Sequence, residues 1–173
     1  MPAIQISYSF ALASLILILP ICLHVFYADM KYKKIRNWSV WALFAIFVIV
    51  GLATLPLMDF AWRFANYAVV FAVLLVMWML RQMGAGDVKF AAVGALFVDA
   101  ADAGLMMWIA FAAILAATAA TLLVRFSPLR KLAPDWAAWR VKSADDAINV
   151  GVGNQMTLPM GTGISLMLCA YLL

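Results

Sequence analysis

Six apolar stretches follow one another along the chain, and they limit the fold more than any other feature. They cover about residues 7–28, 38–57, 62–80, 87–101, 104–124 and 156–173. Most of them approach the ~20 residues that a helix needs to cross a bilayer. The 173-residue chain is 68% hydrophobic and only 12% charged, with a mean hydropathy of +1.04. A soluble domain of this length could not bury so much apolar surface. We therefore predict one all-α domain over residues 1–173, a polytopic bundle of about six transmembrane helices.

The fourth stretch, residues 87–101, is shorter than most of the others. At 1.5 Å per residue its about 15 residues reach ~22 Å, which is less than the ~30 Å hydrocarbon core. Either the preceding Gly-Ala-Gly sequence lies below the membrane surface together with Asp87, or the bilayer thins there. Both alternatives place Asp87 near the lipid boundary.

The basic residues predict the orientation of the bundle. All lysines and arginines except Arg63 fall in or beside the breaks that follow the first, third and fifth stretches. Because basic residues stay on the cytoplasmic side, we expect these breaks to face the cytoplasm and the N-terminus to face outside. This asymmetry also accounts for the net charge of +4. The basic residues form no single stripe, so we expect the partner to be the lipid bilayer and not nucleic acid.

The longest connection, residues 125–155, contains two tryptophans near basic residues. Trp136, Trp139, Arg140 and Lys142 are compatible with a short interfacial helix, apolar on one face and basic on the other. A solvated loop whose tryptophans rest at headgroup level is the alternative.

Two aspartates are expected at the same side of the membrane. Asp29 ends the first stretch and Asp87 opens the fourth, so both lie at the cytoplasmic face in the predicted topology. Ionisable residues in a bilayer are costly and are candidates for function, although each aspartate alone also fits an ordinary charge at a helix end. Gly84 and Gly86 allow another part of the chain to approach the backbone beside Asp87.

Paired carboxylates have a known chemical use. Two close carboxylates share one proton because they do not both ionise easily. The ionised partner takes a proton from water, and the protonated partner polarises a carbonyl and later protonates the leaving amine. This is the chemistry of aspartic proteases, and it requires no metal or cofactor. His24 lies about 140° around a helix from Asp29, so we interpret it as a packing residue, as we do Cys22 and Cys169.

The sequence GAGDVK, residues 84–89, resembles the GxGD signature of intramembrane aspartic proteases. It is similar in particular to type IV prepilin peptidases, which carry one aspartate in a pattern close to D-x5-I-P-N and the other in G-x-G-D-x-K. Ile35 and Asn37 follow Asp29 at the matching offsets. Arg36 stands where the family usually has proline, so we expect the turn after Ile35 to be shaped differently. The sequence LPMGTG, residues 158–163, is similar to the Pro-x-Gly stretch that opens the last span of the family.

The resemblance implies roles for these residues. Asp29 and Asp87 would be the catalytic pair, with the general base left unassigned. Gly84 and Gly86 would shape the backbone beside Asp87, and Lys89 would either tune the local charge or contact lipid headgroups.

The resemblance also implies a substrate. It would be a prepilin-like precursor, cleaved after a glycine at the cytoplasmic face of a bacterial inner membrane or the equivalent archaeal membrane. The paired CxxC motifs of bifunctional members do not occur between the first two stretches. The chain therefore resembles the small, peptidase-only subtype of Flp or tight-adherence pili.

Three other functions are alternatives to this one. Proteases of the signal-peptide-peptidase or presenilin type share GxGD but carry a Tyr-Asp motif, whereas Ala28 separates Tyr27 from Asp29 here. A small proton or ion transporter would use the two aspartates as relays, but its site is usually near the bilayer midplane. A non-catalytic assembly scaffold would not need both carboxylates. The sequence sets no oligomeric state.

Overall fold

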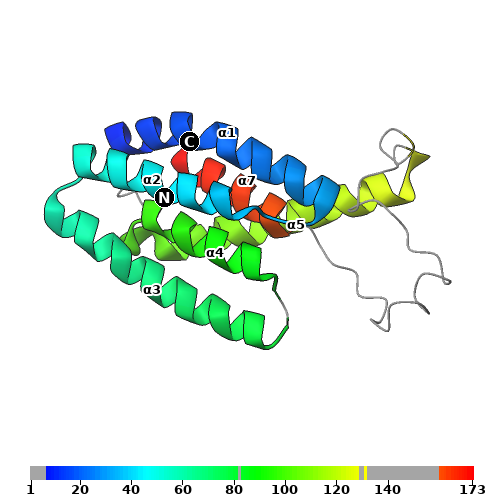
Figure 1. Cartoon of the computed structure of the whole chain (residues 1–173). Helices are drawn as coiled ribbons and strands as arrows, with labels where there is room; N and C mark the ends of the chain where they lie inside the picture. The colour runs from blue at the N-terminus through cyan, green and yellow to red at the C-terminus, as the bar shows by residue number, and fades with distance from the viewer. Residues whose placement is uncertain (1–6, 82, 129–130, 132–159) are drawn as a thin grey trace.

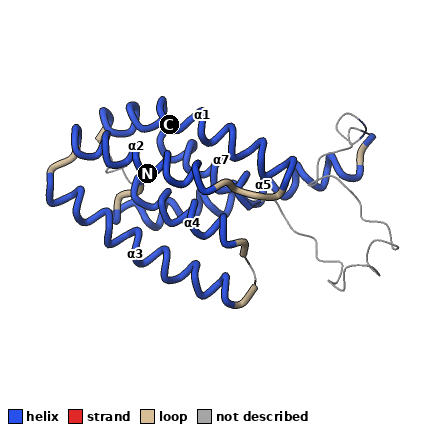
Figure 2. The backbone as a smooth tube through the Cα atoms, viewed as in Figure 1, coloured by secondary structure: helices blue, strands red, loops and turns tan. Residues whose placement is uncertain are grey.

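The computed structural model describes residues 7–81, 83–128, 131 and 160–173. Every regular element in these residues is a helix, and Figure 2 shows no strand among them. The prediction of an all-helical bundle is therefore confirmed. The expected interfacial segment with Trp136 and Trp139, and residues 156–159 of the last apolar stretch, lie outside the described residues.

Among the described residues, four helices are long and apolar enough to cross a membrane. They are α1 (Tyr8–Tyr32), α2 (Asn37–Thr54), α3 (Leu57–Met79) and α5 (Ala103–Phe126). Shorter elements complete the bundle: α4 (Ala85–Gly94), the 3-10 turns η1 (Ala95–Phe97) and η2 (Ala100–Asp102), and α7 (Met160–Leu172). The helix α7 packs against α1 and α5, and α4 packs against α3, α2 and α7 (Figure 1).

Apolar side chains cover the outside of the bundle. On α3, Trp62 is 66% exposed while the neighbouring Arg63 is only 4% exposed. In a water-soluble protein the charged residue would face outward and the tryptophan inward. The reversed arrangement suits a helix that is surrounded by lipid and turns its one cation toward a partner inside the bundle.

Three phenylalanines form an aromatic centre that joins α1, α2 and η1. The ring centroid of Phe47 lies 6.4 Å from that of Phe10 and 5.5 Å from that of Phe97. Both pairs meet edge to face, the geometry that the ring quadrupole favours. These contacts hold the end of the short fourth segment against α1 and α2.

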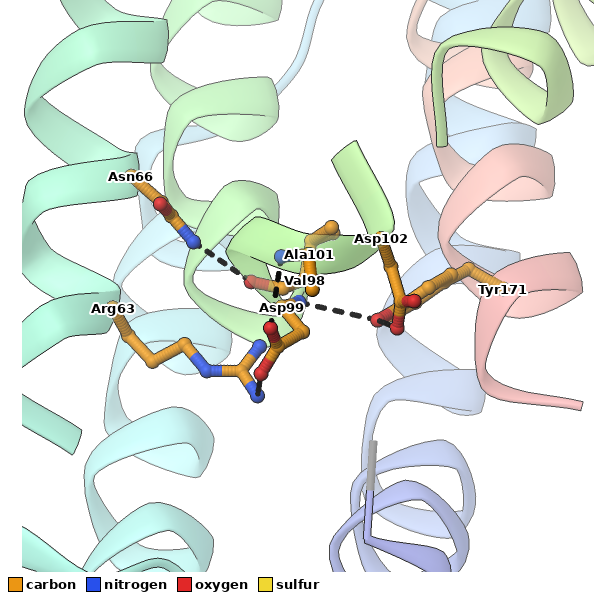
Figure 3. Close-up of polar contacts among 7 residues, drawn as sticks. All are labelled: Arg63, Asn66, Val98, Asp99, Ala101, Asp102 and Tyr171. Atoms are coloured by element: carbon orange, nitrogen blue, oxygen red, sulfur yellow. Dashed lines mark hydrogen bonds and ion pairs between the residues drawn. The ribbon is translucent and has the colours of Figure 1, made fainter. Parts of the chain in front are cut away.

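The fourth apolar stretch is short, as expected, because its α-helix ends at Gly94. Ten residues give a helix of only about 15 Å, and the chain then continues through irregular backbone inside the protein. Figure 3 shows the side chains that form hydrogen bonds with the polar groups of this backbone. The carbonyl of Val98 accepts a hydrogen bond from Asn66 Nδ2 at 2.9 Å, and the amide of Asp99 donates to the Tyr171 hydroxyl at 3.1 Å. Non-helical backbone is tolerated at membrane depth where the protein supplies such partners.

Charged and polar side chains also hold the segment between α4 and α5. Arg63 Nη2 lies 3.0 Å from Asp99 Oδ2, and the Tyr171 hydroxyl donates to Asp102 Oδ2 at 2.8 Å (Figure 3). We call Arg63, Asp99, Asp102 and Tyr171 the Arg63 cluster. It ties α3 and α7 to the segment between α4 and α5. Tyr171 lies nine residues after Thr162, about 14 Å further along α7, so the cluster and the start of α7 are at opposite ends of that helix.

Candidate active site

Asp29 lies on the last turns of α1 and is 5% exposed. Its Oδ2 atom accepts two hydrogen bonds from one residue of α7. The backbone amide of Thr162 donates at 2.8 Å, and the Thr162 hydroxyl donates at 3.2 Å. The amide belongs to the first turn of α7, whose N–H groups have no partner within the helix. The carboxylate is therefore held in place by the start of a second helix.

Asp87 occupies the first turn of α4, outside the four helices that are long enough to span the membrane. Gly84 is the N-cap of α4, and Asp87 accepts a hydrogen bond from its backbone. A Cβ atom at Gly84 would lie 2.7 Å from Asp87 Oδ2, so only glycine leaves room for this contact. Burial, and then the negative charge of Asp29, raise the pKa of Asp87 to about 6. The charge of Asp29 is thus one of the influences on Asp87, and a catalytic role for the two carboxylates stays a prediction.

Ile35 fills the space between the two helix starts that surround the aspartates. A Cβ atom added to Gly86 would lie 3.3 Å from Ile35 Cβ, and one added to Gly161 would lie 2.8 Å from Ile35 Cδ1. The same added atom at Gly161 would lie 3.1 Å from Asp29 Oδ2. The α1–α2 connection thus packs closely on α4 and α7 because both present glycine at the contact.

Lys33 and Arg36 shape that connection. Lys33 ends α1 in the left-handed region, with φ 50° and ψ 42°, and its amide bonds to the carbonyl of Asp29. Arg36, which stands at the position of the family proline, has φ −81° and ψ 139°. These angles are close to those that a proline ring imposes. The backbone at Arg36 is therefore extended, with a φ that a proline would also allow.

Asn37, two residues after Ile35, and Lys89, two residues after Asp87, both line a groove. The groove runs between α2 and α3 and has a volume of about 530 Å³. Its other lining residues are apolar or aromatic: Val40, Trp41, Phe44, Phe64, Tyr67, Phe71 and Val93. The rings of Phe44 and Phe64, both in this lining, lie 6.4 Å apart and connect α2 with α3. Its floor is α4, which lies between α2 and α3 in Figure 1.

Thr162 and Gly161 are the site residues whose roles the sequence did not reveal. The Gly-Thr-Gly sequence matched a family stretch, but nothing in it indicated that these residues contact Asp29. A hydroxyl residue between two glycines at the start of an apolar helix was the available signal, because small residues permit close approach.

Other candidates lie away from the aspartates. The His24 ring packs on Trp38 with 4.9 Å between ring centroids, and its Nε2 atom is buried without a hydrogen-bond partner in the described part of the chain. Cys22 and Cys169 are both free. Within the described residues, no group of three or more His, Cys, Asp or Glu side chains could hold a metal ion.

The comparisons with known proteins identify the class. Residues 16–123 match the model of the type IV leader peptidase family. This match covers more than half of the chain and includes both Asp29 and Asp87. The chain therefore belongs to the type IV leader peptidase family, a family of proteases, and is a multi-pass membrane protein. No curated protein and no solved structure matches the chain.

Proposed function

We propose that this protein is a membrane-embedded aspartic endopeptidase that removes the leader peptide from prepilin-like precursors. The observation that carries the proposal is the placement of two carboxylates, Asp29 at the end of α1 and Asp87 at the start of α4, next to glycines that both pack on Ile35. Both carboxylates lie within the residues that match the leader peptidase family. A buried carboxylate that repels its neighbour retains a proton more readily, which is the state that paired acid–base catalysis needs.

The reaction is hydrolysis of one peptide bond. The ionised aspartate takes a proton from water, and the water oxygen attacks the scissile carbonyl while the protonated aspartate donates to its oxygen. The leaving amine then receives a proton from the pair. Gly84, Gly86 and Ile35 fix the backbone around the two carboxylates, and this role depends on their close contacts.

The proposed substrate has a short basic leader, then a glycine, then an apolar helix in the membrane. Cleavage follows the glycine at the cytoplasmic face of a bacterial inner membrane, or of the equivalent archaeal membrane. Glycine weakens a helix, so the scissile stretch unwinds more easily there. We assign residues 1–173 to one peptidase domain with the N-terminus outside, similar to the small peptidase-only subtype of Flp or tight-adherence pili.

The groove between α2 and α3 suits the apolar helix of such a precursor. Its aromatic lining offers contact to apolar side chains. Asn37 and Lys89, the polar residues of the lining that are close in sequence to Ile35 and Asp87, supply hydrogen-bond donors for carbonyl groups that become free where the precursor unwinds. A precursor helix in this groove would place its unwound end beside α4, which carries Asp87.

The direct test of the activity uses the purified protein in lipid nanodiscs with a prepilin-like precursor. We expect a single cut, and mass spectrometry should place it directly after the glycine. Addition of a chelator should leave the rate unchanged because the proposed mechanism uses no metal. A precursor that stays intact, or a cut at another position, would contradict the proposed activity, and loss of activity on chelation would contradict the mechanism.

A further inference from the structure

The two carboxylates of the pair are held in different ways. Asp29 Oδ2 accepts hydrogen bonds from both the amide and the hydroxyl of Thr162, at 2.8 and 3.2 Å. The Thr162 side chain is itself buried, at 4% exposure. Asp87 is less buried than Asp29 and accepts its hydrogen bond from the backbone of Gly84. Within the part of the chain that the structure describes, Asp29 therefore has a side-chain donor and Asp87 has only a backbone donor.

This difference favours the ionised form at Asp29 and leaves the protonated form to Asp87. Hydrogen bonds to a carboxylate stabilise its ionised form, and they are stronger when the acceptor is charged. The N–H groups at the start of a helix act in the same direction because that end carries a partial positive charge. Asp29 receives both contributions from α7, which begins beside it. Asp87 shares the second contribution because it lies in the first turn of α4, so the hydroxyl of Thr162 is what distinguishes Asp29.

We propose that Thr162 is a positioning residue that holds Asp29 ionised, so that Asp29 is the general base and Asp87 the protonated acid. This assignment rests on the proposed function. Asp29 takes a proton from water as the new C–O bond forms, and Asp87 gives its proton to the carbonyl oxygen. Asp87 then regains a proton from a hydroxyl of the tetrahedral intermediate, Asp29 protonates the amine, and the C–N bond breaks. Asp29 ends ionised and Asp87 protonated, as they began.

The surrounding charges are few. Among the described residues, Lys33 beyond the end of α1 acts electrostatically on Asp29, and Asp29 acts electrostatically on Asp87 of α4. Thr162 on α7 and Ile35 in the α1–α2 connection are uncharged. A change at Thr162 therefore alters the hydrogen bonding of Asp29 without removing a charge from the site.

The test compares cleavage rates of Thr162→Val and Thr162→Ser across the pH range. Valine keeps the shape but removes the hydroxyl donor, so ionised Asp29 becomes less stable. We expect the acidic limb of the pH–rate profile to shift by about one unit to higher pH. The rate on that limb then falls about tenfold, while the plateau at higher pH changes little. Serine restores the hydroxyl and should restore the wild-type profile.

Thr121→Val is the matched control. Thr121 is also buried, but its hydroxyl donates to the carbonyl of Ala117 within α5, at 2.7 Å. This variant should leave the pH profile unchanged. If Thr162→Val follows the wild-type profile, or loses activity equally at every pH, Thr162 does not set the charge state of Asp29.

A second measurement does not depend on the folding of Thr162→Val. Infrared titration of Asp87→Asn measures the ionisation of Asp29, and infrared titration of Asp29→Asn measures that of Asp87. The spectrum of the variant that carries both substitutions is subtracted in each case. Asp29 should ionise at lower pH than Asp87, and the reverse order would overturn the assignment. If Asp29→Asn or Asp87→Asn cleaves at the wild-type rate, the proposed function fails. If both are inactive and the titration order is reversed, only the assignment of roles fails.

Discussion

At the scale of single residues, Gly161 determines how closely α7 approaches the Asp29 carboxylate. A Cβ atom there would lie 3.1 Å from both Cγ and Oδ2 of Asp29, and 2.8 Å from Ile35 Cδ1. The end of the isoleucine side chain has room to rotate, but Asp29 is fixed by Thr162. The position of the Asp29 carboxylate therefore depends on the absence of one methyl group at Gly161.

We predict that Gly161→Ala slows cleavage at least about tenfold, because small displacements of a reacting group are costly in rate. The measurement is kcat/KM for a prepilin-like precursor. Gly104→Ala is the control, since a Cβ atom at Gly104, in the first turn of α5, meets nothing within 4 Å. Cleavage by Gly161→Ala at the wild-type rate would show that the close contact has no catalytic importance.

At the scale of elements, the short helix α4 depends on the Arg63 cluster. The helix ends at Gly94, and the backbone that follows is held by side chains of α3 and α7 (Figure 3). The Tyr171 hydroxyl connects two parts of this arrangement, because it accepts from the Asp99 amide and donates to Asp102. The cluster positions α4, and α4 carries Asp87 at its other end.

Tyr171→Phe should lower the free energy of unfolding by about 1–3 kcal/mol, since it removes the hydrogen-bond partner of buried polar groups. Denaturant titration in detergent micelles measures this change. The folded variant should still cleave its precursor, because the hydroxyl is far from the aspartates along α7. Tyr8→Phe, at an exposed position, should have no effect. Unchanged stability of Tyr171→Phe would mean that the cluster does not hold the segment.

The groove between α2 and α3 gives a prediction about the precursor helix. Trp41 lines the groove and is 70% exposed, and Trp108 on α5 is 74% exposed but lies elsewhere. Trp41→Ala should raise KM roughly fivefold, the equivalent of about 1 kcal/mol for a lost aromatic contact. Trp108→Ala should not change KM. Equal effects of the two substitutions would show that the precursor helix does not use the groove.

At the scale of the whole molecule, apolar patterning predicted the helices but not their ends. The first helix is predicted over residues 7–28, but α1 continues to Tyr32. The helical hydrogen bonds continue beyond the apolar stretch into the basic residues. Expected at 62–80, α3 already begins at Leu57. Asp59 is favourable in the first turn of a helix, and Arg63 finds a partner in Asp99. Charged residues mark the end of an apolar stretch and not the end of a helix.

The contacts that complete the site could not be predicted from periodicity. Spacing along one helix indicates which residues share a face, but it carries no information on which distant helix covers that face. Thr162 is 133 residues after Asp29, and Asp99 is 36 residues after Arg63. The motifs around Asp29 and Asp87, taken together, predict a catalytic pair, and this stays a prediction. The support given to Asp29 by α7 became visible only in three dimensions.

The measurement that tests the central claim most directly compares three proteins in lipid nanodiscs: Asp29→Asn, Asp87→Asn and the control Asp59→Asn. Asparagine keeps the size of aspartate but cannot ionise, and Asp59 is an exposed carboxylate near the start of α3. The paired mechanism predicts that Asp29→Asn and Asp87→Asn fold but leave a prepilin-like precursor intact, while Asp59→Asn cuts it at the wild-type rate. Normal cleavage by either Asp29→Asn or Asp87→Asn would contradict catalysis by this pair.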